Sequence, residues 1–188
     1  NVVGSDGLEV VLGGGRRSFI PRVENADPET GQPGERLDNR NLILEWSEKY
    51  ENSSYAWNKE QFDAIDPNST DHLLGLFNPS HMQYSPDIDE DVGGEPTLTE
   101  MTAKAIEILQ RNKNGFYLNV EAGRIDHAHH AQNPYRALYD TIELAKAVKI
   151  AYEMVNLEDT LIIVTADHSH VFTIAGYPKR GNPILGKV

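Results

Sequence analysis

Two short polar segments of the sequence concentrate the residue types that can bind metal ions. The first, Glu121 to His130, reads E-A-G-R-I-D-H-A-H-H, and the second, Asp167 to His170, reads D-H-S-H. Together they hold five of the seven histidines in the chain. Carboxylate oxygens and imidazole nitrogens bind Zn²⁺, and carboxylates with water suit Mg²⁺. Because the chain has no cysteine, any metal must be held by Asp, Glu and His, and this clustering predicts a metal site rather than isolated structural histidines.

The spacing within each segment limits how its residues can share an ion. Asp126 and His130 are four positions apart, so they lie on one face if this segment is helical. Asp167 and His168 are adjacent, so their side chains diverge in an extended backbone. These two reach one ion only where the chain bends, and otherwise they serve two ions.

Two other motifs have the residue types of catalysis or phosphate binding but not the pattern. Asp167, His168 and Ser169 are the residue types of a hydrolase triad, yet consecutive side chains cannot form its line of nucleophile, base and orienting carboxylate. The run Gly13-Gly14-Gly15-Arg16-Arg17 lacks the Gly-Lys-Ser/Thr ending of a phosphate-binding loop. We interpret it as a turn followed by two surface arginines.

Apolar periodicity and turn residues predict the elements that position these segments. Short apolar runs, typical of buried strands, occur at 8–12, 72–77, 116–120 and 160–165. Helices are expected at 37–50, at 97–111 behind a capping box of Thr97 and Glu100, and from Pro134 with Asn133 as its N-cap. Two continuous apolar strands separated by a long helix indicate a βαβ unit in a mostly parallel sheet with helices on both faces.

The candidate metal ligands follow directly after two of these strands. In an open α/β sheet, ligands bind beyond the carboxyl ends of the strands, and sequential strands of a βαβ unit usually lie near each other. One rim of the sheet is therefore expected to carry five residues together: Glu121, Asp126, His130, Asp167 and His168.

The same segments resemble those of animal alkaline phosphatases. Glu121 to His130 is similar to their E-G-G-R-I-D-H-x-H-H, departing only at Ala122 where Gly is usual, and Thr165 to His170 is similar to their T-A-D-H-S-H. The similarity covers essentially the whole chain through further segments: Val11 to Arg16, Arg36 to Asp38, Gly75 to Phe77 and Ala175 to Pro178. It implies an incomplete α/β sandwich in which residues 1–188 are part of a single domain, without its N-terminal nucleophile region and its C-terminal region.

The resemblance also implies two Zn²⁺, one Mg²⁺ and a serine that is transiently phosphorylated. By match, Asp126 and His130 would bind the first Zn²⁺, and Asp167 and His168 the second. Glu121 would bind Mg²⁺.

Three further histidines of the two segments are not metal ligands by match. His127 would contact the phosphate through water. His129 and His170 are expected to support the ligands by hydrogen bonds.

Several parts of the family's site have no match in this sequence. The Asp-Ser-Ala segment with the nucleophile, the Asp shared by two metals, the phosphate-gripping Arg and a late His ligand of the first Zn²⁺ are all missing. Arg124 does not match that Arg and is expected to form a structural ion pair. The chain alone is therefore expected to be inactive or nearly so.

The animal family has a separate Ca²⁺ site, and four residues fall near the matching positions. They are Glu29, the carbonyl of Phe77, Asn78 and Glu95. Asn78 and Glu95 stand where Glu and Asp are usual, so this Ca²⁺ site is the weaker part of the match.

Composition narrows the partners and the location. The net charge of -12 argues against binding to nucleic acid, which needs basic side chains against phosphates. No apolar run approaches the roughly 20 residues of a membrane span, and N-x-S/T sequons at Asn52 and Asn68 favour a secreted protein.

The resemblance implies a homodimer that hydrolyses phosphate monoesters outside the cell, either secreted or on a lipid anchor beyond this segment. A phosphodiesterase or sulfatase of the same superfamily, or a catalytically inactive surface binding protein, are the alternatives.

Overall fold

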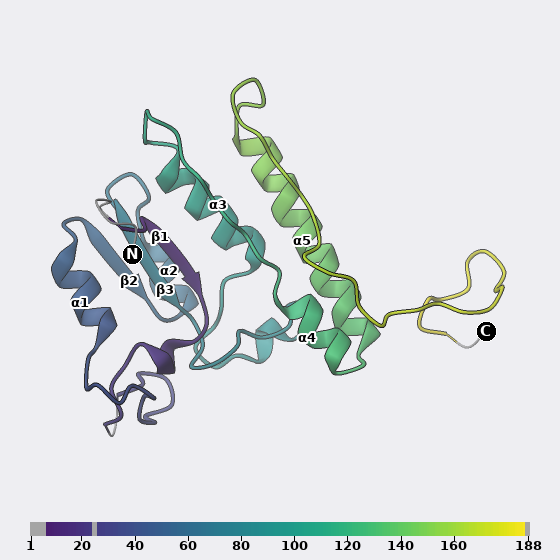
Figure 1. Ribbon diagram of the computed structural model, residues 1–188, viewed down its shortest axis with the longest axis horizontal. Coiled ribbons are helices and arrows are strands. Elements are labelled where there is room, and N and C mark those ends of the chain that lie inside the picture. The colour runs from purple at the N-terminus through teal and green to yellow at the C-terminus, as the bar shows by residue number, and fades with distance from the viewer. Residues whose placement is uncertain (1–6, 24–25, 187–188) are drawn as a thin grey trace.

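The computed structural model describes residues 7–23 and 26–186 of the chain (Figure 1). Three parallel strands form one sheet in the order β1 (Val10–Gly13), β3 (His72–Leu76) and β2 (Ser53–Ala56). Leu74 of the central strand pairs with Val11 on one side and Tyr55 on the other. The predicted strands near 8–12 and 72–77 are confirmed, and so is the parallel α/β class.

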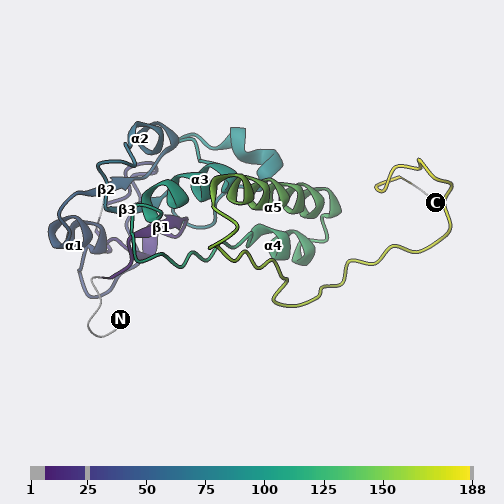
Figure 2. The same ribbon diagram turned by 90° about the horizontal axis from the view of Figure 1, so that it is seen from above.

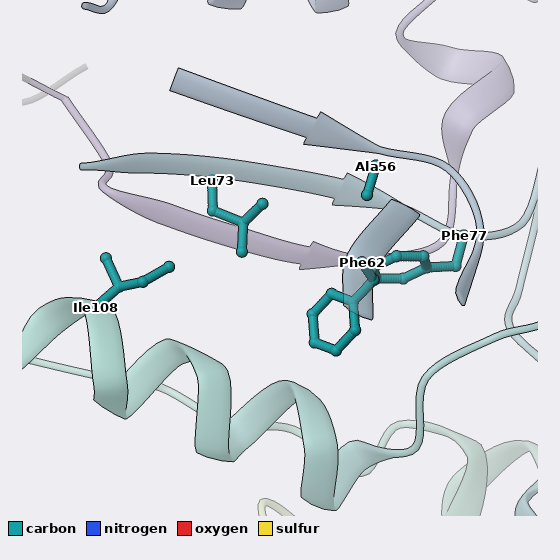
Figure 3. Close-up of a cluster of buried hydrophobic side chains, with 5 residues drawn as sticks. All are labelled: Ala56, Phe62, Leu73, Phe77 and Ile108. Carbon is teal, nitrogen blue, oxygen red and sulfur yellow. The ribbon is translucent and has the colours of Figure 1, made fainter. Parts of the chain in front are cut away.

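Helices cover both faces of this sheet. On one face, His72 of β3 stacks on Tyr50 at the end of α1 (Leu42–Lys49), with ring centroids 4.0 Å apart. The next residue, Leu73, points to the opposite face, because side chains alternate along a strand. There it packs with Phe62 of α2 (Lys59–Ala64) and Ile108 of α3 (Leu98–Leu109), as Figure 3 shows. The core is therefore an apolar layer between the sheet and α2 and α3.

A second group of helices lies beside α3. The long helix α5 (Pro134–Met154) packs against α3 and against the short helix α4 (Arg124–His130), while the 3₁₀ helix η2 (Ser85–Glu90) contacts α5. A further 3₁₀ turn, η1 (Arg16–Ser18), follows β1. The C-terminal part of the chain leads away from these helices (Figure 2).

Local capping determines where the helices begin. Thr97 and Glu100 form the predicted capping box of α3, and the Asn133 side chain accepts from the backbone N–H of Arg136 at the start of α5. The first helix begins later than predicted, at Leu42 instead of residue 37. The reason is Asn41, whose side chain accepts from two backbone N–H groups of the first turn and so fixes the N-terminus there.

The predicted strands at 116–120 and 160–165 do not form. Both segments are extended, but neither has a hydrogen-bonded neighbour in the described part of the chain, and a strand exists only as part of a ladder. Most of their apolar side chains therefore face solvent, with Leu161 83% and Ile163 76% exposed. The helix predicted between them does form, but the predicted βαβ unit does not, because its two strands are not formed.

The prediction of two surface arginines after β1 is wrong for Arg16. A Cβ on Gly14 would lie 2.3 Å from the carbonyl oxygen of Ser80, and Gly15 has φ +82°, so only glycine fits this close turn. The turn directs Arg16 inward, where its side chain is 0% exposed. Its guanidinium donates to Asp27 at 2.7 Å, to Glu29 at 2.5 Å and to the carbonyl of Leu76 at 2.8 Å.

Removing this buried charge is expected to destabilise the fold strongly. Arg16→Met leaves the Asp27 carboxylate buried without its partner, which typically costs about 3–5 kcal/mol. The matched control is Arg17→Met, because the Arg17–Glu35 pair is about half exposed and should change stability by no more than about 1 kcal/mol. Urea unfolding of the three proteins measures both values, and equal losses at the two positions would contradict the buried ion cluster.

Candidate metal centre

Helix α4 presents the first candidate ligands. The residues Arg124 to His130 do form a helix, so Asp126 and His130 lie one turn apart on the same face, with His130 Nε2 3.5 Å from Asp126 Oδ2. The opposite side of α4 packs on α5 through two fully buried alanines, Ala128 and Ala137. Small side chains at this contact let the two helices approach closely, so α5 fixes the direction in which Asp126 points.

The second polar segment reaches the same carboxylate. His168 Nε2 lies 3.7 Å from Asp126 Oδ1 and 3.5 Å from Asp167 Oδ2, and His170 Nε2 lies 3.5 Å from Asp126 Oδ1. The two clusters predicted to converge are therefore side by side. They meet at α4 and not on the rim of the β1–β3–β2 sheet, because the strands expected to lead into them do not form.

Asp126 has the surroundings expected of a metal ligand. Its Oδ1 is buried and has no hydrogen-bond partner among the described residues. Zinc ligands at about 2.0–2.1 Å in tetrahedral geometry lie roughly 3.4 Å from one another, close to the 3.5 Å between Asp126 Oδ2 and His130 Nε2 and the 3.5 Å between Asp167 Oδ2 and His168 Nε2. Ligand atoms of Asp126, His130 and His170 all lie within 4.8 Å of one another, and no other three such side chains do so in residues 7–23 and 26–186. The donor set fits Zn²⁺.

The hydrogen bond of His168 leaves its outer nitrogen free to bind a cation. Nδ1–H donates to the carbonyl of Ser169 at 2.8 Å, so Nε2 carries the lone pair that a metal ligand needs. This hydrogen bond, with the negative charges of Asp167 and Asp126, raises the pKa of His168. The local potential thus favours a positive charge at this place.

The remaining predicted residues of these segments lie differently. Glu121 is exposed, and within the described ranges no hydrogen bond or ion pair joins it to Asp126 or His168. His127 faces away from the carboxylates, since its Nδ1 lies 3.0 Å from Arg124 Nη1 and its ring packs on His81. Arg124 forms no ion pair in the part of the chain that the structure describes, contrary to prediction; its guanidinium lies 3.7 Å from the ring centre of Tyr84.

His170 lies directly against Asp126, although it was predicted only to support the metal ligands by hydrogen bonds. Its side chain is only 16% exposed, and its ring stacks on His129 with centroids 4.9 Å apart. A sequence signal for this existed in the spacing, because residues 168 and 170 point to the same side of an extended segment.

Protein donors contact three of the four candidate calcium residues. Ca²⁺ needs about 6–8 oxygen ligands. Both Glu95 oxygens already accept, from Asn78 Nδ2 at 2.9 Å and from the backbone of Gln83 at 2.7 Å. Asn78 Oδ1 accepts from the backbone of Ser80, and Glu29 Oε2 accepts from Arg16. The calcium site at these residues stays a prediction.

Comparison with known proteins identifies the family of this chain. The family model described as alkaline phosphatase matches residues 1–188, the whole length of the sequence. The chain belongs to the alkaline phosphatase family. The predicted resemblance is confirmed, and alkaline phosphatases are hydrolases of phosphate esters that depend on metal ions.

Curated alkaline phosphatases match over nearly all of this chain. It is 45% identical over 185 residues to a membrane-bound alkaline phosphatase of Bombyx mori, covering 96% of this chain and 33% of the relative. It is 42% identical over 186 residues to the tissue-nonspecific isozyme of Homo sapiens, covering 95% of this chain and 35% of the relative. The chain thus spans about a third of the length of these relatives.

Solved structures of alkaline phosphatases share the fold. The enzyme of Thermus thermophilus superposes with a TM-score of 0.65 at 30% identity, over 78% of this chain and 28% of that chain. The cold-active enzyme of a Shewanella species gives 0.55 at 25% identity, over 77% of this chain and 29% of that one. Among the described residues, no helix is both long and apolar enough to cross a membrane.

The buried Glu95 is expected to make stability depend on pH. Burial raises its pKa from 4.5 to about 7, against the opposing effect of its two hydrogen bonds. The folded chain then holds this proton more tightly than the unfolded chain, so stability falls as pH rises from about 4.5 to about 7. Glu95→Gln, which cannot ionise, should flatten this fall, whereas the exposed Glu90→Gln should not. Melting temperatures at a series of pH values measure this fall in stability. If the melting temperature of Glu95→Gln falls with pH as steeply as that of the unchanged protein, Glu95 is not the cause.

Proposed function

We propose that this chain forms the metal-binding part of an enzyme that hydrolyses phosphate monoesters through a phosphoserine intermediate. The observation that carries the proposal is the approach of three imidazoles to the Asp126 carboxylate, in segments that match the family over their whole length. The nucleophilic serine, the phosphate-gripping Arg and a further His ligand would come from parts of the enzyme that these 188 residues do not include.

Four residues would hold two Zn²⁺ ions in this proposal. Asp126 and His130 would bind the first ion, Asp167 and His168 the second, and Glu121 would bind Mg²⁺. When bound, such a pair of ions activates a serine hydroxyl and neutralises charge on both apical oxygens of an in-line phosphoryl transfer.

The other histidines act on these ligands and on the substrate. His170 Nε2 lies 3.5 Å from Asp126 Oδ1 and would help to orient this carboxylate toward the metal. His127 would donate from its ring to a phosphate oxygen or to a water bound to it. A separate Ca²⁺ site would use Glu29, the carbonyl of Phe77, Asn78 and Glu95.

The setting of the enzyme is part of the same proposal. It acts as a homodimer outside the cell, secreted or held at the membrane by a lipid anchor beyond this segment. Both sequon asparagines, Asn52 and Asn68, are exposed, as glycosylation requires. Partners are phosphate monoesters, and the net charge of -12 disfavours nucleic acid.

Two neighbouring residues of the second segment are expected to behave differently in the longer enzyme. Asp167→Ala removes a metal bond and a negative charge together, so turnover of an aryl phosphate should be abolished and bound zinc reduced. Ser169→Ala should lower turnover by roughly 10- to 100-fold at most, because only its backbone carbonyl contacts His168. Turnover with bound zinc counted for each variant measures this. Loss of turnover in Ser169→Ala with zinc fully retained would identify Ser169 as the nucleophile and overturn the assignment.

The 188-residue chain alone is expected to bind zinc without hydrolysing phosphate esters. Loss of a nucleophile costs many powers of ten in a covalent mechanism. Assay of the purified chain with zinc and magnesium, with and without chelator, is the measurement. Chelator-sensitive turnover by the chain alone would mean that its nucleophile lies within these residues. A longer enzyme that binds zinc but cleaves only phosphodiesters or sulfate esters, or no ester, would favour the alternative functions.

A further inference from the structure

A buried tyrosine near the candidate centre contacts two guanidinium groups. Tyr84, on the segment between β3 and α3, is 8% exposed. The guanidinium carbon of Arg124 lies 3.7 Å from its ring centre and that of Arg136 lies 4.6 Å from it. A cation over an aromatic face gains about 0.5–2 kcal/mol, and more when it is shielded from water. The ring therefore holds a cation from α4 and a cation from α5 at once.

The segment that carries Tyr84 is itself tied to α5. Both oxygens of Asp140 lie 3.3 Å from the backbone N–H of Ser85, which donates to this carboxylate. Arg136 Nε forms an ion pair with Asp87 Oδ2 at 2.6 Å. Tyr84 also packs with the alanines Ala128 and Ala137 at the α4–α5 contact. The ring thus has a fixed position against both helices, and it can impose that position on Arg124.

Arg124 in turn determines which ring nitrogen of His127 carries the hydrogen. An arginine has only donors, so the 3.0 Å contact between Arg124 Nη1 and His127 Nδ1 makes Nδ1 an acceptor. The neutral ring then carries its hydrogen on Nε2, and Nε2–H is a donor on the side away from Arg124. A phosphate oxygen, or a water bound to it, is an acceptor that suits this group.

We propose that Tyr84 is a positioning residue for phosphate binding, which acts through Arg124 on His127. It rests on the proposed function in that His127 faces the phosphate. The tyrosine ring fixes the Arg124 guanidinium, and the guanidinium fixes the orientation and tautomer of the imidazole. The aromatic face is what this role needs, and no hydrogen bond of the phenol hydroxyl takes part in it.

The first experiment measures inhibition by inorganic phosphate in the longer enzyme. Tyr84→Leu should raise the inhibition constant of phosphate and the KM about tenfold, with a smaller effect on kcat and with zinc content unchanged. Tyr84→Phe keeps the ring and should stay within about twofold. Replacing the exposed Tyr117 by Leu is the matched control and should change nothing. In a His127→Ala background, Tyr84→Leu should add no further loss, because residues that act through one another are not additive.

Two results would overturn the proposal. One is a tenfold loss from Tyr84→Leu on top of His127→Ala. The other is an effect of Tyr84→Leu that appears as lost zinc or lost kcat with phosphate affinity intact, which would indicate support of the fold alone. Arg124→Met provides the same comparison where Tyr84→Leu does not fold.

The second experiment uses the 188-residue chain and does not depend on activity. Nitrogen-15 spectra of the histidines above pH 8 should show His127 as a single tautomer with its hydrogen on Nε2. Tyr84→Leu and Arg124→Met should both give exchange between two tautomers, and Tyr84→Phe should not. A His127 with its hydrogen on Nδ1, or one unaffected by either substitution, contradicts the positioning. If the longer enzyme hydrolyses no phosphate ester, the proposed function fails, while these spectra still decide whether Tyr84 positions His127.

Discussion

The Asp126 carboxylate is the point on which the candidate centre depends. Three imidazoles approach it, and one of its oxygens is buried without a hydrogen-bond partner among the described residues. An unpaired buried carboxylate oxygen is costly, and a cation is the partner that would satisfy it. Its direction is set by α4, whose position follows from the contact of Ala128 and Ala137 with α5. Packing of two small side chains thus determines where the charged groups meet.

The segment between β3 and α3 joins the sheet to this centre. At its start, backbone contacts link it to the glycine turn after β1, where Gly15 N–H donates to the carbonyl of Ser80. At its middle, Tyr84 lies under Arg124 and Arg136. At its end, Glu95 accepts hydrogen bonds from the Asn78 side chain and the Gln83 backbone. Hydrogen bonds and buried ion pairs within the protein therefore fix the position of this segment, which in turn supports α4.

The sequence predicted those features that local chemistry determines. Capping residues such as Thr97 and Asn133 satisfy backbone groups within their own first turn, so the starts of α3 and α5 were predicted from these local motifs. The convergence of Asp126 with His168 was predicted because polar segments after neighbouring elements tend to meet at one place. Both family and fold class followed from motifs that are short and specific.

The errors arose where distant residues decide the structure. Residues 116–120 and 160–165 have the apolar pattern of strands, but a strand also needs neighbours, and none pairs with them in the described chain. Burial of Arg16 could not be predicted from its own segment, because its partners Asp27 and Leu76 are remote in sequence. The same is true of Arg124, whose contact with Tyr84 depends on a segment forty residues earlier.

The central claim is that Asp126 and His130, with Asp167 and His168, hold zinc. The most direct measurement is an anomalous difference map at the zinc edge from crystals of the protein grown with zinc. The account predicts strong peaks within about 2.0–2.2 Å of Asp126 and His130 and of Asp167 and His168. Peaks located elsewhere on the chain, or no peak at these four side chains at saturating zinc, would contradict it.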